Sequence, residues 1–196
     1  MKVLVLYCHP DPQSFCAAIR DRVMAELARK GAEIRLTDLY AEGFDPVLRG
    51  ADLARYASVP DNRAGVEDHA TNLLWCDRLV VIHPTWWGGL PAMLKGWMDR
   101  VLLPGIAFHL PDGPTARLRP GLRHIGGILV LTTCGAGPMA YWLAGATGRR
   151  QVLRSLGALC KPLATRRFLA LYRMDLTTPA TRARHLERVA RAVARL

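Results

Sequence analysis

The sequence predicts an α/β fold: a doubly wound five-stranded parallel sheet, with strand order 2-1-3-4-5 and helices on both faces. Three observations lead to this prediction. Short apolar runs alternate along the chain with amphipathic helical stretches, which is typical of a parallel sheet. Five such runs fit into 196 residues, which matches this order better than the six-stranded dinucleotide fold. The unusual residues follow the first, third and fourth runs, at the strand ends where such sheets bind ligands.

The strands are recognised as continuous apolar runs, because a parallel strand covered on both faces shows no polar alternation. The first run, KVLVLYC at 2–8, ends at a His-Pro-Asp-Pro sequence. The other expected strands are 33–38, 78–83, 125–132 and a segment within 159–171.

The expected helices are bounded by residues that cap or end them. Ser14 is a good N-cap for the first helix, and Gly31 ends it. Pro91 suits the first position of a helix that extends to about residue 102, and Thr178 precedes the last helix. Residues 104–123 are rich in proline and glycine, which predicts a long loop of a kind that often carries function. Further helical stretches are expected at 51–56, 66–75 and 146–156.

The composition limits the class of protein. Hydrophobic residues make up 51% and charged residues 22% of the chain, a balance that excludes a mainly disordered protein. No apolar run has the length of a membrane span, and the first run is too short for a signal-peptide core. These two features predict a cytoplasmic protein, and because no repeat or linker divides the chain, we expect a single domain over residues 1–196.

The charge is strongly basic, at +11 from 27 Lys and Arg against 16 Asp and Glu. Such an excess suits anionic partners, among them nucleotides, nucleic acid and membrane surfaces. The basic residues are scattered, so we expect no nucleic-acid partner. One denser stretch has the spacing of a solvated helix face: Arg182, Arg184, Arg188, Arg191 and Arg195. The five cysteines show no CxxC and no metal-ligand spacing, which favours a reducing compartment and predicts no metal site.

The loop after the first strand has the features of a phosphate site. A helix begins there, and its N-terminus offers unpaired N–H groups and the positive end of the helix dipole. Ser14 either caps this helix or gives its hydroxyl to a phosphate, and His9 adds a donor. The alternative is an ordinary N-cap serine beside a surface histidine.

The loop after the third strand suits a planar ring. Its sequence at 86–89 is WWGG, which places two large flat side chains beside flexible backbone. The alternative is that one tryptophan packs in the core while the other covers a partner surface.

Small residues follow the fourth strand at 132–137, where glycines let backbone N–H groups approach a ligand. Gly135-x-Gly137-x-x-Ala140 is not a dinucleotide fingerprint, because Pro138 interrupts it and it does not follow the first strand. The chain also lacks a GxxxxGK[ST] phosphate loop and the GxSxG of a serine hydrolase. No histidine can be assigned to Cys134 as a base, so we interpret it as an inert loop cysteine.

Together these motifs resemble those of the NAD(P)H:quinone oxidoreductases, the diaphorase-type flavodoxin-like flavoenzymes. The resemblance covers about residues 1–171 and is most specific in PTWWGGLPAMLKGWMDRV at 84–101. Its other motifs are HPDPQSF at 9–15, DLYAEGFDP at 38–46 and TTCG at 132–135. It implies a flavin held by the three loops, NAD(P)H as co-substrate, a quinone-like acceptor and a homodimer with active sites between the subunits. It favours FAD over FMN.

The resemblance also implies roles for particular residues. The flavin-phosphate side is assigned to His9, Ser14 and Phe15, with Cys16 where an asparagine is more usual. The isoalloxazine ring is assigned to Pro84, Thr85, Trp86, Trp87 and Gly88, and its pyrimidine edge to Thr132, Thr133, Cys134 and Gly135. The catalytic hydrogen-bond donor is assigned to Tyr141, and the quinone pocket to Trp87 and Phe108.

One departure and one alternative remain. Thr147 stands where the mammalian-type enzymes have a histidine, and a threonine cannot take up a proton near neutral pH, so a tyrosine–histidine relay is broken here. The main expectation is ping-pong transfer of two electrons from NAD(P)H through the flavin to an acceptor that uses the same pocket. The alternative is a regulatory flavoprotein subunit of a membrane potassium-efflux transporter, because some family members are such ancillary subunits.

Overall fold

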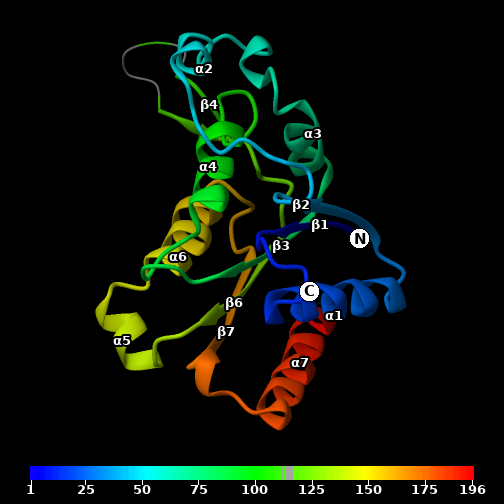
Figure 1. The fold of residues 1–196 in the computed structure, drawn as a ribbon. Coiled ribbons are helices and arrows are strands. Elements are labelled where there is room, and N and C mark those ends of the chain that lie inside the picture. Colours follow the sequence, from blue (N-terminus) through cyan, green and yellow to red (C-terminus); the bar gives the residue numbers. More distant parts are fainter. Residues whose placement is uncertain (112, 114–116) are drawn as a thin grey trace.

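The fold is a parallel sheet flanked by helices (Figure 1), as seen in a computed structural model that describes residues 1–111, 113 and 117–196. All neighbouring strands of the five-stranded sheet are parallel, in the order β2-β1-β3-β6-β7. Its strands are β1 (Lys2–Tyr7), β2 (Glu33–Asp38), β3 (Arg78–Pro84), β6 (Gly127–Cys134) and β7 (Thr165–Tyr172). The expected order 2-1-3-4-5 is therefore confirmed, with β6 and β7 as its fourth and fifth strands.

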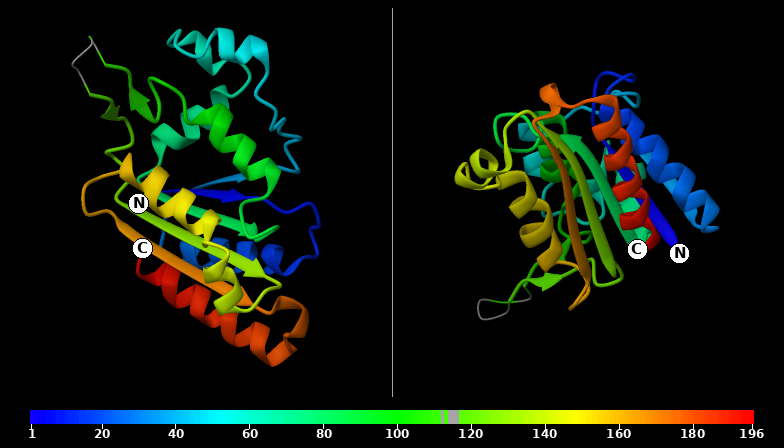
Figure 2. Two further views of the ribbon diagram at one scale, coloured as in Figure 1. Left: turned by 90° about the vertical axis from the view of Figure 1, so that its left-hand side faces the viewer. Right: turned by 90° about the horizontal axis from the view of Figure 1, so that it is seen from below.

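Helices cover both faces of this sheet, and Figure 2 shows the two layers edge-on in its right-hand view. On one face α1 (Phe15–Arg29) and α7 (Pro179–Ala194) pack together over Val3, Val5 and Tyr7. On the other face α3 (Glu67–Trp75) and α4 (Ala92–Val101) cover Leu4, Leu6 and the strand positions that alternate with the first set. Successive side chains of a strand point to opposite faces, so these continuous apolar runs form two hydrophobic cores.

The remaining elements are short. They are α2 (Gly50–Ala54), η1 (Asp61–Arg63), β4 (Phe108–His109), β5 (Arg119–Pro120), α5 (Pro138–Leu143), α6 (Thr147–Arg150), the π-helical turn η2 (Gln151–Leu156) and η3 (Met174–Leu176). None of these elements adds a strand to the five-stranded sheet, because β4 and β5 pair only with each other.

Several details of the expected elements were wrong. The fourth strand begins at Gly127, because the N–H of Gly126 is bonded to Asp77 ahead of β3, and it continues to Cys134. Residues 132–134 therefore end a strand rather than forming a loop. The expected loop at 104–123 contains a two-stranded antiparallel ribbon, β4 with β5, and α5 was not expected. Pro91 is the N-cap of α4 with ψ 147°, one residue before the first helical position.

No helix among the described residues is long and apolar enough to cross a membrane. In the same part of the chain, no three His, Cys, Asp or Glu side chains are arranged to hold a metal ion.

Candidate functional site

The carboxyl ends of β1, β3 and β6 meet at one edge of the sheet, and the segments that follow them are joined by direct contacts. The Cys16 Sγ lies 3.4 Å from the Thr133 Oγ1, and the ring centroids of His9 and Trp86 are 6.1 Å apart. The N–H of Thr85 donates to the carbonyl of Thr133 at 2.7 Å. The structure thus brings together the three segments that the sequence singled out.

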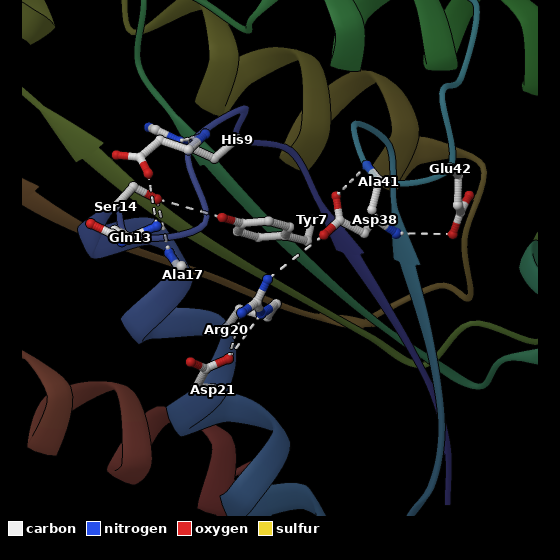
Figure 3. A network of polar contacts seen from close by, with 11 residues as sticks. Tyr7, His9, Gln13, Ser14, Ala17, Arg20, Asp21, Asp38, Ala41 and Glu42 are labelled. Atoms are coloured by element: carbon white, nitrogen blue, oxygen red, sulfur yellow. Dashed lines mark hydrogen bonds and ion pairs between the residues drawn. The ribbon is translucent and has the colours of Figure 1, made fainter.

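The segment after β1 leads into the N-terminus of α1 (Figure 3). The Ser14 hydroxyl accepts the N–H of Ala17 at 3.2 Å, so Ser14 is the N-cap. His9 Nδ1 accepts the N–H of Asp11 at 3.0 Å, which fixes the imidazole over the loop. Within the described chain, the N–H groups of Phe15 and Cys16 have no acceptor. These two N–H groups and the helix dipole make this turn a site for an anionic group.

A network of polar contacts joins this turn to the ends of β1 and β2 (Figure 3). The Tyr7 hydroxyl lies 3.5 Å from Ser14 Oγ, and burial raises the pKa of Tyr7, so the phenol stays protonated. The Arg20 guanidinium lies over the Tyr7 ring at 4.8 Å and 3.7 Å from the Asp38 carboxylate at the end of β2. This network ties α1 to β1 and β2 and fixes where the helix begins.

The segment after β3 forms a tight hairpin. Trp86 and Gly89 exchange two backbone hydrogen bonds, at 3.3 and 3.0 Å, around Trp87 and Gly88. Both central residues have positive φ, 48° for Trp87 and 71° for Gly88, as in a type I′ turn. The left-handed conformation is unfavourable for tryptophan, and strained residues of this kind cluster at functional sites. The turn presents the whole Trp87 side chain to solvent, with a relative exposure of 106%.

Thr147 holds this hairpin in place. Its hydroxyl donates to the carbonyl of Gly88 at 2.9 Å, from the first residue of α6. A Cβ on Gly89 would lie 3.0 Å from the Thr147 Oγ1, and one on Gly148 3.1 Å from Leu90, so the fit is close. Thr147 stands where the resemblance expects a titratable histidine. Its hydroxyl instead makes a hydrogen bond that stabilises the hairpin.

The segment after β6 exposes backbone donors. Among the described residues, the N–H groups of Gly135 and Gly137 have no hydrogen-bond acceptor. The side chains of Thr132 and Thr133 are buried and bonded to neighbouring strands and loops, so they position the backbone rather than face solvent. Cys134 is 4% exposed and burial raises the pKa of its thiol, which agrees with an inert cysteine.

Tyr141 lies beneath these segments rather than on their surface. It is 3% exposed and its ring is stacked on Phe168, with centroids 5.9 Å apart. Burial raises the pKa of Tyr141 to about 12, against a backbone hydrogen bond from Arg149 that lowers it.

Phe108 is not brought to the site by the fold of one chain. It lies in β4, which pairs with Pro120 of β5, and the chain continues from there to the amino end of β6. Figure 1 accordingly shows β4 at the far end of the molecule from α5. Its assignment to the same pocket as Trp87 stays a prediction that requires a second chain.

His83 is a buried residue to which the sequence analysis gave no role. It is 1% exposed at the end of β3, its Nδ1 lies 2.8 Å from the carbonyl of Pro84, and its Nε2 has no partner among the described residues. Burial lowers the pKa of His83 to about 4, so the ring is neutral. The sequence feature that could have identified His83 is its position as a polar residue in the otherwise apolar run of β3.

These features fit a flavin on chemical grounds. The free N–H groups at the start of α1 suit its phosphate, and the fully exposed Trp87 suits its flat ring. The free N–H groups of Gly135 and Gly137 suit the ring edge where negative charge develops on reduction. The site as a whole has the architecture of a doubly wound sheet that binds its ligand beyond the carboxyl ends of the strands.

Comparison with known proteins agrees with this architecture. The model of the flavodoxin-like fold family matches residues 1–195, so the chain belongs to that family. The chain is 32% identical over 163 residues to the ribosyldihydronicotinamide dehydrogenase (quinone) of Pongo abelii, covering 75% of this chain and 69% of the relative.

Two solved structures extend the comparison. The NAD(P)H:quinone oxidoreductase of Methanothermobacter marburgensis is similar with a TM-score of 0.77 and 25% identity, over 98% of this chain and 95% of that one. An FMN-dependent NADH-azoreductase of Bacillus anthracis, in complex with FMN, has a TM-score of 0.73 and 16% identity, over 100% of this chain and 99% of that one. At that identity the second likeness concerns the fold.

Proposed function

We propose that this protein is a flavin-dependent oxidoreductase that passes electrons from NAD(P)H to a quinone-like acceptor. The observation that carries the proposal is the meeting of three segments at one sheet edge: the free N–H groups at the start of α1, the exposed Trp87 hairpin and the free N–H groups after β6. The names of the quinone-reducing relatives support the same activity.

The chain's own groups have distinct tasks in this reaction. The flavin, when bound, supplies the hydride chemistry. The N–H groups of Phe15 and Cys16 bind its phosphate, while the Trp87 hairpin orients the ring and shields one face from water. The N–H groups of Gly135 and Gly137 would stabilise negative charge at the edge of the flavin ring, in the manner of an oxyanion hole.

The identity of the flavin and the kinetic order belong to the same proposal. The sequence resemblance favours FAD. The Bacillus anthracis azoreductase, which is similar in fold, instead binds FMN. Either flavin carries the same ring and at least one phosphate group, FMN a monophosphate and FAD a diphosphate, for the groups described. Since NAD(P)H and the acceptor would use one pocket in turn, ping-pong kinetics are expected.

We also propose a cytoplasmic homodimer. Trp86 and Trp87 are exposed on the hairpin, and Met139 and Leu143 of α5 are exposed at 77% and 82%. An apolar surface of this kind on a soluble protein is typical of an interface. A second chain would also supply the Phe108 that one chain leaves distant. The relatives reported above are enzymes and do not favour the transporter-subunit alternative.

The first experiment is the visible spectrum of the purified protein. The oxidised protein should be yellow, should bleach when NAD(P)H is added without oxygen, and should regain its colour with a soluble quinone. Mass analysis of the released flavin distinguishes FAD from FMN. A colourless protein that takes up neither flavin would contradict the proposal.

Replacing Trp87 by glycine should separate stability from cofactor binding. Glycine adopts positive φ without penalty, so Trp87→Gly should be as stable as the wild type or gain up to about 1 kcal/mol in its free energy of unfolding. Loss of the stacking surface should weaken flavin binding about tenfold. The checks are chemical denaturation and a fluorescence titration with flavin.

Leu163 offers a matched control for this variant, because it also has positive φ, 63°, and is 99% exposed, but lies before the amino end of β7. Leu163→Gly should leave flavin affinity unchanged. If the wild type, Trp87→Gly and Leu163→Gly bind flavin with equal affinity, Trp87 does not contact the flavin.

Removing the Tyr141 hydroxyl should slow the reaction while the cofactor stays bound. We expect Tyr141→Phe to reduce flavin reduction by NAD(P)H about 2- to 150-fold, the range of about 0.5–3 kcal/mol for one lost hydrogen bond to a neutral or charged acceptor. Stopped-flow absorbance measures the rate, and the flavin-to-protein ratio is the control. An unchanged rate would show that Tyr141 only packs against Phe168 and Tyr172.

A further inference from the structure

A groove of about 530 Å³ lies between the edge strand β7 and α7, which run side by side at one margin of the sheet (Figure 2). Its floor contains Leu129, Leu169 and Ala192. Its rim carries four arginines: Arg167, Arg188, Arg191 and Arg195. Among the residues described around it, no acidic side chain lines the groove.

Local geometry explains why the arginines converge. Arg188, Arg191 and Arg195 are three and four positions apart, so they form one stripe along α7. Arg167 and Leu169 are two residues apart on β7 and therefore share the face of the strand that is turned to α7. Arg167 is in register with Leu129 of β6, which places its guanidinium above the apolar floor.

Among the described residues, none of the four guanidinium groups forms an ion pair or a side-chain hydrogen bond, and the groove itself holds no acid. Other arginines of the protein are paired: Arg20 with Asp21 and Asp38, and Arg22 and Arg29 with Glu26. Arg191 also lines a neighbouring hollow, whose acidic residues are Glu26 and Glu187. Like charges at this spacing repel one another, and an anion bound among them would relieve that repulsion.

The groove is separate from the proposed flavin site. Leu129 precedes Cys134, the last residue of β6, by five positions, which is about 16 Å along a strand at about 3.3 Å per residue. The α1 turn and the Trp87 hairpin lie beyond that carboxyl end.

We propose that this groove is a second binding site, for a small compound that carries two or three linked phosphate groups. The planar guanidinium pairs with phosphate oxygens through two parallel hydrogen bonds, and four of them match several anionic groups close together. The volume is in the range of small-molecule sites. A two-fold symmetric contact between two copies at this groove is unfavourable, because it would bring the same four arginines of each copy together.

Isothermal titration with inorganic tripolyphosphate tests the proposal, on the protein with and without saturating FMN. We expect one site per chain that FMN does not block, since phosphate binding at the start of α1 would be lost on adding flavin. Arg167→Ala and Arg191→Ala should each raise the dissociation constant at least tenfold. Arg184→Ala removes the same charge from an exposed position of α7 outside the groove and should change it less than twofold.

Three results would overturn the proposal: no saturable binding at physiological salt, binding that FMN abolishes, or equal losses in Arg184→Ala and Arg191→Ala. A parallel titration with a single-stranded RNA 20-mer addresses the competing class of ligand. If the RNA binds and tripolyphosphate does not displace it, the groove is part of a diffuse polyanion surface instead. Displacement by tripolyphosphate, lost in Arg167→Ala, supports the small-molecule site.

Discussion

Lowering the pH from 7 to 5 should lower the free energy of unfolding by about 4 kcal/mol, because two histidines are buried in their neutral form. The pKa of His83 and that of His185 are each lowered to about 4, chiefly by burial. The rings are 1% and 2% exposed, and their Nε2 atoms have no partner among the described residues. In the unfolded chain both titrate near pKa 6.5.

The direction follows from which state binds the proton. Well above pH 6.5 both states are neutral at these positions and stability is fully present. As the pH falls toward 4, the unfolded chain takes up two protons that the folded protein excludes, so stability is lost. Each histidine contributes about 2 kcal/mol of this loss by pH 5. That is a large share of the roughly 5–15 kcal/mol typical of a domain.

Urea denaturation at pH 7, 6 and 5 measures this loss. His185→Gln should reduce the loss between pH 7 and pH 5 by about 2 kcal/mol, because it removes the share of that residue. His109→Gln is the matched control, since His109 is exposed on β4 and should leave the pH dependence unchanged. A free energy of unfolding that is the same at pH 7 and pH 5 would contradict the prediction.

The strands next to the site show what could be predicted from the sequence. β1, β2 and β3 were placed within one residue, because each is a short run flanked by residues that stop a strand. The parallel sheet followed from the alternation of strands with helices, and its order followed from the count of five strands. The positions of the three ligand segments then followed from the topology alone, since the carboxyl ends of parallel strands lie at one edge.

The details of the site depended on contacts between distant residues. The left-handed Trp87 could not be predicted, because a Trp-Gly pair is not one of the usual type I′ turn sequences and the Thr147 hydroxyl that holds it lies on another element. The burial of Tyr141 depends on Phe168 and Tyr172 of β7. The stripe of arginines on α7 is typical of a solvated face until β7 adds Arg167 opposite it.

The second large effect is expected at Gly96, in the middle of α4. A Cβ at this position would overlap the carbonyl oxygen and Cβ of Pro46 and lie 2.6 Å from its Cα, atoms that belong to backbone and a rigid ring. α4 and the segment at 44–47 would have to move apart. We expect Gly96→Ala to lower the free energy of unfolding by about 3 kcal/mol, the upper range for overpacking a well-packed contact.

This variant should also impair the site, because α4 begins directly after the Trp87 hairpin. Pro91 is its N-cap, and Leu90 packs against α6 at Gly148. A shift of α4 is therefore transmitted to the hairpin, and flavin retention should fall even where the protein is still folded. The measurements are the urea midpoint and the flavin-to-protein ratio.

Gly50→Ala in α2 is the control for this variant. A Cβ at Gly50 would meet nothing within 4 Å, and alanine is the better helix former, so this substitution should leave the urea midpoint unchanged or raise it slightly. If Gly96→Ala and Gly50→Ala unfold at the same urea concentration, the contact between α4 and Pro46 is not the close approach that requires glycine.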